Sequence, residues 1–198
     1  MSGISPTAWI IIALALATVL AWGLWFGLGW HKQKKARQEQ ADKMAARQER
    51  RQKKRDDRHR VRQAEVSAVR SARANGDRRP VVLVVDDSPT ALEATRRVLE
   101  DHRYRVVTAT HGKDAWSALQ DLHPDLILTD IEMPHLDGFG LLRMVRADLA
   151  LADIPVVFMT ANPVHHIRAG KQQGIDGFVM KPYQDEDLIG QLQYLLQE

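Results

Sequence analysis

The sequence predicts an α/β fold in which a doubly wound parallel sheet of five strands carries helices on both faces. Two observations lead to this prediction. Short apolar runs recur between Pro80 and Glu198, and segments with helical spacing of apolar residues alternate with them. The runs are apolar at successive positions, which is typical of strands buried on both faces of a parallel sheet. Regular alternation of strands and helices places the helices in layers on either side of that sheet.

The expected elements follow one another in a regular order. The strands are expected at residues 81–85, 106–109, 126–129, 156–159 and 178–180. The helices are expected at residues 91–100, 113–122, 139–146, 164–173 and 185–196. A segment of this length is usual for one domain.

Charge divides the chain into three zones, which we take as its domains. Residues 1–30 carry no charged side chain, and we predict that they form an N-terminal transmembrane anchor. Residues 31–79 hold 18 Lys and Arg against 7 Asp and Glu and form a basic linker. Residues 80–198 hold 10 against 18 and form the α/β domain. The chain has no cysteine, which excludes disulfides and thiolate metal sites.

An uncharged, mostly apolar run at residues 8–30 predicts the membrane-spanning helix. Its 23 residues would form a helix about 34 Å long, enough to cross a hydrocarbon core of about 30 Å. Trp9 and Trp30 lie at its two ends, where aromatic rings favour the membrane interface. A cleaved signal peptide would begin with a basic segment, and residues 1–7 contain none. We therefore expect an uncleaved, single-pass anchor in the inner or plasma membrane.

The flanks of this run predict its orientation. Basic residues follow it at once, beginning with Lys32, Lys34 and Lys35. The positive-inside rule therefore places the α/β domain in the cytoplasm. Gly23 and Gly27 form a pair of small residues that lets two membrane helices approach closely, so the sequence also offers a dimer through this helix.

The basic linker leaves more than one reading open. Residues 31–74 are rich in helix-forming residues and contain no Gly or Pro, which fits a solvated helix or a partly disordered spacer. The first turns also have the charge to lie on anionic lipid headgroups. No nucleic-acid partner is expected, because aromatic residues are not interleaved with the basic ones. The turn residues Asn75-Gly76-Asp77 mark the boundary of the next domain.

Polar side chains follow four of the predicted strands. Asp86 and Asp87 follow the first strand, Asp130 the third, Thr160 the fourth and Lys181 the fifth. Ligands of doubly wound folds bind at this carboxyl edge of the sheet. Three carboxylates that lie close together repel one another unless a cation is present, and oxygen ligands favour a hard ion such as Mg²⁺.

Each of these residues has an ordinary explanation when it is taken alone. Asp87 or Ser88 could cap the helix after Pro89. A Thr at the end of a strand is usually a turn residue, and a Lys is usually solvated. A functional site is favoured because the residues occur together at successive strand ends of one predicted sheet.

Four motifs carry a resemblance to a known family. They are Val-Val-Asp-Asp-Ser at 84–88, Leu-Thr-Asp-Ile-Glu-Met-Pro-His-Leu-Asp-Gly at 128–138, Met-Thr-Ala at 159–161 and Gly-Phe-Val-Met-Lys-Pro at 177–182. With these motifs, residues 80–198 resemble the receiver domain of two-component response regulators, in the stand-alone form typified by the chemotaxis regulator. The resemblance implies a flavodoxin-like fold.

The resemblance also implies a role for each site residue. Asp130 matches the phosphoacceptor, and Thr160 and Lys181 match the residues that contact the phosphoryl group. Phe178 matches the switch aromatic, and the bond before Pro182 is expected to be cis. The implied ligands of Mg²⁺ are Asp86, Asp87, Asp130 and the backbone carbonyl of Glu132, while Glu132 and Asn162 are the positions that tune hydrolysis.

The function implied is a signalling switch rather than an enzyme. A sensor histidine kinase or phosphotransfer protein would supply the phosphoryl group, and an unidentified target would be contacted at the membrane. No output domain is recognisable after the last predicted helix. Two alternatives stay open: a phosphate sink for a kinase, and a membrane-tethered scaffold that works without phosphorylation.

Overall fold

A computed structural model describes the backbone of residues 6–197. It also describes the side chains of these residues, except at 6–17, 19–21, 23–37 and 163–165. The chain divides into two compact units, residues 1–56 and residues 57–198. The first helix, α1 (Pro6–Ala74), contributes to both units.

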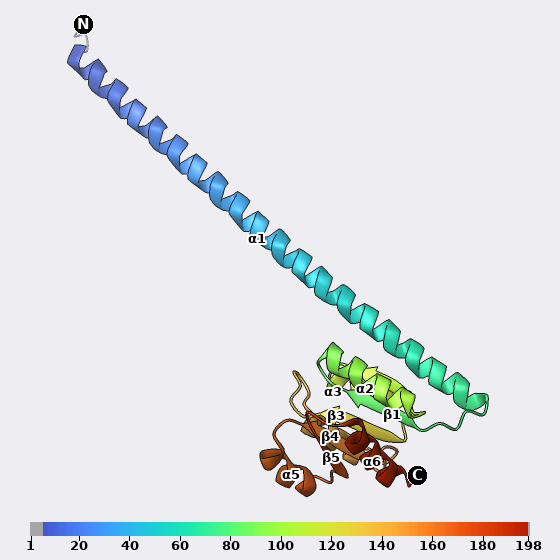
Figure 1. Cartoon of the computed structure of the whole chain (residues 1–198). Coiled ribbons are helices and arrows are strands. Elements are labelled where there is room, and N and C mark those ends of the chain that lie inside the picture. Colours follow the sequence, from blue (N-terminus) through green and yellow to red (C-terminus); the bar gives the residue numbers. More distant parts are fainter. Residues whose placement is uncertain (1–5, 198) are drawn as a thin grey trace. The chain divides into compact units, whose positions relative to one another are not determined.

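The second unit is built on a sheet of five parallel strands in the order β2-β1-β3-β4-β5. The strands are β1 (Val81–Val85), β2 (Arg105–Ala109), β3 (Leu126–Asp130), β4 (Val156–Thr160) and β5 (Gly177–Met180). The helices between and after them are α2 (Pro89–Asp101), α3 (Gly112–Leu119), α4 (Gly138–Ala147), α5 (Pro163–Gln172) and α6 (Asp185–Leu196). The predicted α/β fold is therefore confirmed, with element ends that differ by a few residues (Figure 1).

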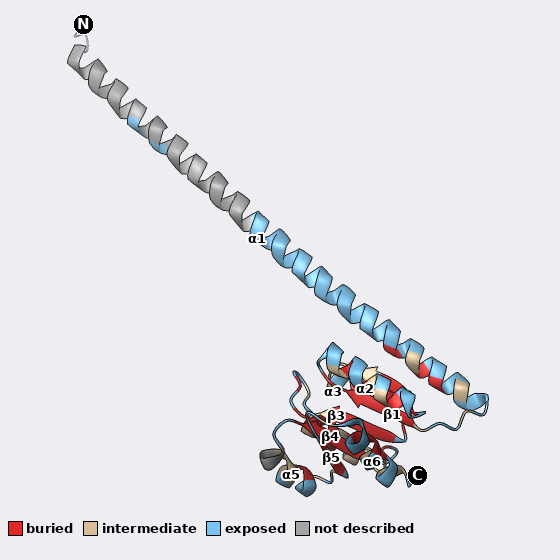
Figure 2. Cartoon of the chain, in the orientation of Figure 1, coloured by how far each residue is buried: buried red, intermediate tan, exposed pale blue. Residues whose placement is uncertain are grey.

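Alternate residues of each central strand enter two separate cores, because successive side chains of a strand point to opposite faces. Val82 and Val84 of β1 pack with residues of α2 and α6. Leu83 of the same strand packs on the other face with residues of α3 and α4. All five residues of β1 are buried, which explains the continuous apolar run in the sequence (Figure 2).

The carboxyl-terminal part of α1 is packed into this second unit. Val66 and Val69 are buried and join the core on the face of α3 and α4. The carboxylate of Glu65 accepts hydrogen bonds from the backbone N–H of Thr108, at 2.9 Å, and from the guanidinium of Arg96. Because β2 is an edge strand, Glu65 satisfies a donor that the sheet itself leaves unpaired.

Two arginines of the same segment form ion pairs with α3 and with the loop after it. The guanidinium of Arg62 is almost fully buried and pairs with Asp114 at 2.9 Å. Arg73 pairs with Asp125 at 2.7 Å. Residues 57–74 were expected to belong to the basic linker, but the structure packs them against residues after 80. The helical alternative for the linker is the one observed, and residues 38–60 of this helix are exposed.

Among the residues that the structure describes, none forms a helix long and apolar enough to cross a bilayer. Residues 8–30, the expected anchor, belong to α1, but their side chains lie outside the described ones except for Thr18 and Trp22.

Candidate functional site

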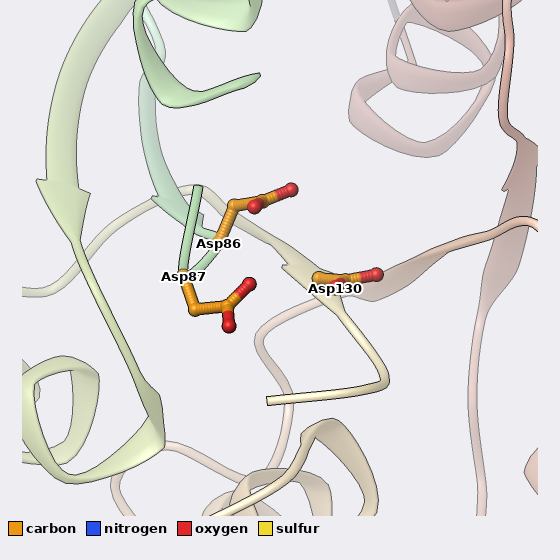
Figure 3. A group of neighbouring side chains, drawn as sticks. All are labelled: Asp86, Asp87 and Asp130. Carbon is orange, nitrogen blue, oxygen red and sulfur yellow. The ribbon is translucent and has the colours of Figure 1, made fainter. Parts of the chain in front are cut away.

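The register of the sheet brings the carboxylates of two strands together. Val85, the last residue of β1, lies beside Thr129 of β3, so Asp86 and Asp130 each come one residue later on neighbouring strands. Asp87 follows in the loop before α2. Ligand oxygens of Asp86, Asp87 and Asp130 lie within 4.8 Å of one another (Figure 3). The three predicted metal-binding carboxylates therefore share one site at the carboxyl edge of the sheet.

The loop after β1 separates the cap of α2 from this acidic group. The hydroxyl of Ser88, not the carboxylate of Asp87, caps α2 and accepts a hydrogen bond from the N–H of Ala91. The carboxylate of Asp86 is buried and accepts a hydrogen bond from the N–H of Ser88 at 2.8 Å. Asp87 is exposed, and its carboxylate is turned toward the other two (Figure 3).

Lys181 supplies the positive charge of the site. It follows β5, and its Nζ lies 2.6 Å from Oδ2 of Asp86 and 3.1 Å from Oδ1 of Asp130. The Lys181–Pro182 bond is cis, in the geometry that the resemblance implied. Partial burial lowers the pKa of Lys181, but its hydrogen bond to Asp86 and the charges of both carboxylates outweigh burial and raise the pKa above its ordinary value. The lysine is therefore a fixed cation at neutral pH.

The negative charge of Asp130, the phosphoacceptor candidate, is only partly balanced by its neighbours. Burial raises the pKa of Asp130, and the charge of Asp86 adds to this effect. Lys181 and the backbone N–H of Ile131 lower the pKa, but they do not cancel the rise. Burial and the charge of Asp86 destabilise the ionised form of Asp130, and a bound cation would offset this effect. The oxygen ligands of the site fit a small divalent ion.

The structure places Thr160 beside this group but with other partners. Thr160 ends β4 and is buried. Its hydroxyl accepts a hydrogen bond from the N–H of Asn162 at 3.0 Å and lies 2.8 Å from Nδ1 of His166. The described hydrogen bonds of this hydroxyl thus lead into α5 rather than to Asp130 or Lys181. No motif in the sequence signals this contact between His166 and Thr160.

Phe178 of β5 lies against α5 and against a neighbouring aromatic ring. Its ring meets the ring of Phe158 edge-on, with centroids 6.0 Å apart. A Cβ atom added to Gly170 of α5 would lie only 2.7 Å from Cζ of Phe178, so glycine lets the helix pass close to this ring. The other predicted residues, Glu132 and Asn162, are exposed in the loops after β3 and β4. The hydrogen bonds described for the structure include none to the Glu132 carbonyl.

Residues 82–193 match the model of the response regulator receiver domain. The chain belongs to the response-regulator receiver family. This match covers more than half of the chain, and it runs from the second residue of β1 to the last turn of α6.

Three relatives illustrate the receiver assignment. Protein PilH of Pseudomonas aeruginosa is 35% identical over 109 residues, which are 54% of this chain and 90% of PilH. The chemotaxis response regulator CheY4 of Vibrio cholerae is 31% identical, with a TM-score of 0.56, over 59% of this chain and 98% of that one. The receiver domain of sensor histidine kinase PA1611 of P. aeruginosa is 27% identical, with a TM-score of 0.57, over 61% and 99% of the two chains.

The structure of the PA1611 receiver contains a magnesium ion in its active-site cleft. The chain spans only about half the length of several other curated relatives that it matches. Receiver domains are signalling domains, so the coarse prediction of a two-component signalling role is confirmed.

Gly138 packs against the backbone of Asp130, so a substitution there tests how closely the residues around the site are packed. A Cβ atom at Gly138 would lie 2.5 Å from the backbone oxygen of Asp130. We expect Gly138→Ala to lower the free energy of unfolding by about 1–3 kcal/mol, because backbone atoms must shift to admit a methyl group. The same shift should displace Asp130 from its position beside Lys181. Urea unfolding would measure the loss of stability.

The matched control is Gly190→Ala in α6. A Cβ atom there meets nothing within 4 Å. Since alanine is the better helix former, the control raises stability by about 0.5–1 kcal/mol. Equal effects of the two substitutions would contradict the tight packing behind Asp130.

Proposed function

We propose that this chain is a phosphorylation-dependent switch of a two-component system, and that Asp130 accepts the phosphoryl group. The observation that supports this most directly is the position of the Asp130 carboxylate, which shares a site with two other carboxylates and lies 3.1 Å from Lys181 in a receiver domain. The donor is a phosphohistidine of a sensor histidine kinase or of a phosphotransfer protein. A carboxylate oxygen of Asp130 bonds to phosphorus, and the P–N bond to the donor breaks, with its electron pair returning to the histidine.

The proposed cofactor is Mg²⁺, held by Asp86, Asp87 and Asp130 with the backbone carbonyl of Glu132. The donor set supports this choice, because three carboxylates that converge within 4.8 Å offer the oxygen ligands that a hard ion prefers. When bound, the ion would neutralise charge on the phosphoryl oxygens, which is the main requirement of phosphoryl transfer. Lys181, with its Nζ 3.1 Å from Oδ1 of Asp130, supplies a second positive charge.

Thr160 and Phe178 are proposed to convert the phosphoryl group into a change of surface. The Thr160 hydroxyl would leave its partners in α5 and donate to a phosphoryl oxygen. The space that it leaves would be taken by the ring of Phe178, which already packs against α5 at Gly170. This is a population shift between two packings of α5 and β5, driven by a new local charge. Glu132 and Asn162, exposed beside the site, are the positions proposed to tune hydrolysis.

The output is proposed to be protein–protein contact at the membrane. Residues 8–30 would be the single-pass anchor, with the receiver in the cytoplasm, because the run is uncharged and basic residues follow it. Tethering raises the effective concentration of the receiver near membrane-bound partners. Sedimentation with membranes, for the full chain and for a chain without residues 1–30, tests the anchor. If both forms sediment equally, the anchor proposal fails.

The switch itself is tested by chemical phosphorylation of the full chain in mild detergent. With Mg²⁺ and acetyl phosphate, intact-mass measurement should show one added phosphoryl group, which disappears slowly by hydrolysis. No added mass in the presence of Mg²⁺ would sink the proposal and favour a scaffold that works without phosphorylation. A partner that binds only the phosphorylated form would argue against a pure phosphate sink.

Magnesium should stabilise the folded chain. We expect saturating Mg²⁺, at about 100 times its Kd, to add about 2.7 kcal/mol to the free energy of unfolding, since the ion binds only the folded site. Asp87→Asn should remove this gain, yet it should cost little without Mg²⁺, because Ser88 and not Asp87 caps α2. Thermal unfolding with Mg²⁺ and with a chelator measures both. Equal gains in the two proteins would show that Asp87 is not a ligand.

A further inference from the structure

His166 has a place in the receiver site that the family motifs do not assign to it. It lies in the second turn of α5, and its Nδ1 is 2.8 Å from the hydroxyl oxygen of Thr160. Its ring is half-buried and meets the ring of Phe139 at 68°, with centroids 6.0 Å apart. The imidazole is therefore held in position by packing on one side and bonded to Thr160 on the other.

The hydroxyl of Thr160 has only one proton to donate. Its oxygen already accepts a hydrogen bond from the N–H of Asn162 at 3.0 Å. In the tautomer of His166 whose Nδ1 carries no proton, this nitrogen is an acceptor, and the hydroxyl donates its proton to it. A phosphoryl oxygen is also only an acceptor, so the hydroxyl cannot donate to His166 and to the phosphoryl group at the same time.

We propose that His166 is a positioning residue that holds the Thr160 hydroxyl in its resting hydrogen bond and so sets how readily the site accepts a phosphoryl group. The proposal rests on the proposed function of Asp130 and Thr160 and adds a residue to that site. Loss of the Thr160–His166 bond is part of the cost of activation. Weakening this bond in the resting protein therefore shifts the equilibrium toward the activated arrangement.

The hydrogen bond between Thr160 and His166 also affects the aromatic rings that pack between His166 and Phe178. Phe139 also meets Phe158 edge-on at 4.9 Å, and Phe158 meets Phe178 at 6.0 Å. His166 thus stands at one end of a row of rings whose other end is Phe178. When the hydrogen bond to Thr160 breaks, the ring of His166 can shift, and this happens in the same step in which the ring of Phe178 is proposed to move.

Two substitutions separate the hydrogen bond from the ring contact. His166→Phe keeps a ring against Phe139 and removes the nitrogen. His166→Asn keeps a polar atom near the position of Nδ1 and removes the ring. We would titrate the full chain, in detergent and with saturating Mg²⁺, with beryllofluoride as the phosphoryl mimic and measure its Kd by calorimetry at one neutral pH.

His166→Phe should bind beryllofluoride about fivefold more tightly than the unsubstituted chain, the effect of one modest net hydrogen bond. His166→Asn should stay within about twofold of the unsubstituted chain, which is the rescue that a purely structural role of the ring would not give. The proposal is overturned if His166→Phe binds no more tightly, or if both variants change alike. In a Thr160→Val background, which lacks the hydroxyl, His166→Phe should have no effect, and a persistent effect would also overturn it.

Imidazole ¹⁵N NMR tests the resting bond without any phosphoryl group. The Nδ1 resonance of His166 should show an acceptor nitrogen and should move in Thr160→Val. If it does not move, the proposal fails even if the site is phosphorylated. If it moves but the unsubstituted chain binds no beryllofluoride, the proposed function fails and the hydrogen bond stands as a structural contact only.

Discussion

Asp130→Asn should abolish phosphorylation of the chain by acetyl phosphate. The amide nitrogen and oxygen are poor nucleophiles, and Asn cannot form a stable acyl phosphate, so the rate should fall by at least about 1000-fold. The fold should survive, since the change removes a charge that burial already disfavours, as the raised pKa of Asp130 indicates. Intact-mass kinetics in Mg²⁺ would measure the loss, and urea unfolding without Mg²⁺ would show a stability equal to or above that of the unsubstituted chain.

The matched control for this experiment is Asp153→Asn. Asp153 is exposed between α4 and β4, so the substitution removes the same charge and adds the same amide away from the site. The control should be phosphorylated at the normal rate. If Asp130→Asn still takes up one phosphoryl group at a comparable rate, another residue is the acceptor, and the roles of Lys181 and Thr160 would have to be assigned again around that residue.

Arg62→Met should lower the free energy of unfolding by about 2–3 kcal/mol, near the lower limit for breaking a buried ion pair. Arg62 is only 6% exposed, and its guanidinium lies 2.9 Å from the carboxylate of Asp114. Methionine keeps the apolar stem of the side chain but leaves the carboxylate without its cation. Because Asp114 retains the hydroxyl of Thr110 at 2.9 Å and some exposure, the cost stays below that of a fully buried charge.

Arg70→Met, two turns further along α1, is the control for Arg62→Met. Arg70 is 61% exposed in its side chain and pairs with Asp121 at 3.5 Å. Exposed pairs contribute little, so this variant should lose less than about 0.5–1 kcal/mol. Urea unfolding of the full chain, followed at the receiver by the signal of Trp116 after the other tryptophans are replaced, compares the two variants. Equal costs would show that residues 57–74 do not form part of the folded unit.

The pH dependence of this ion pair has a definite sign. Burial raises the pKa of Asp114, but the hydrogen bonds from Arg62 and Thr110 outweigh burial and leave the pKa below its ordinary value. A depressed carboxyl pKa contributes stability above the unfolded pKa, and that contribution is lost as the pH falls through the folded pKa. The difference between Arg62→Met and the unsubstituted chain should therefore be complete at neutral pH and should shrink in acid.

The sequence by itself determined the sheet and the location of the site. Continuous apolar runs such as 81–85 are strands because both faces of a parallel sheet are covered, and this signal is local. Asp86 and Asp130 could be placed at one edge without coordinates, because the carboxyl ends of parallel strands meet there. The structure agrees, with the ligand oxygens of the acidic group converging at that edge.

Only the tertiary structure decided what the polar and isolated apolar residues outside the motifs do. Val66 and Val69 are two isolated apolar residues in a charged helix, a pattern that does not predict a buried face. They become core residues because the edge strand β2 and α3 pack against them. The sequence also left Asp87 and Ser88 as equal candidates for the cap of α2, a choice made by backbone geometry. His166 reaches Thr160 because α5 starts where it does after β4. Periodicity records which face of an element is buried, whereas the partner of a single hydrogen bond depends on how elements far apart in sequence pack together.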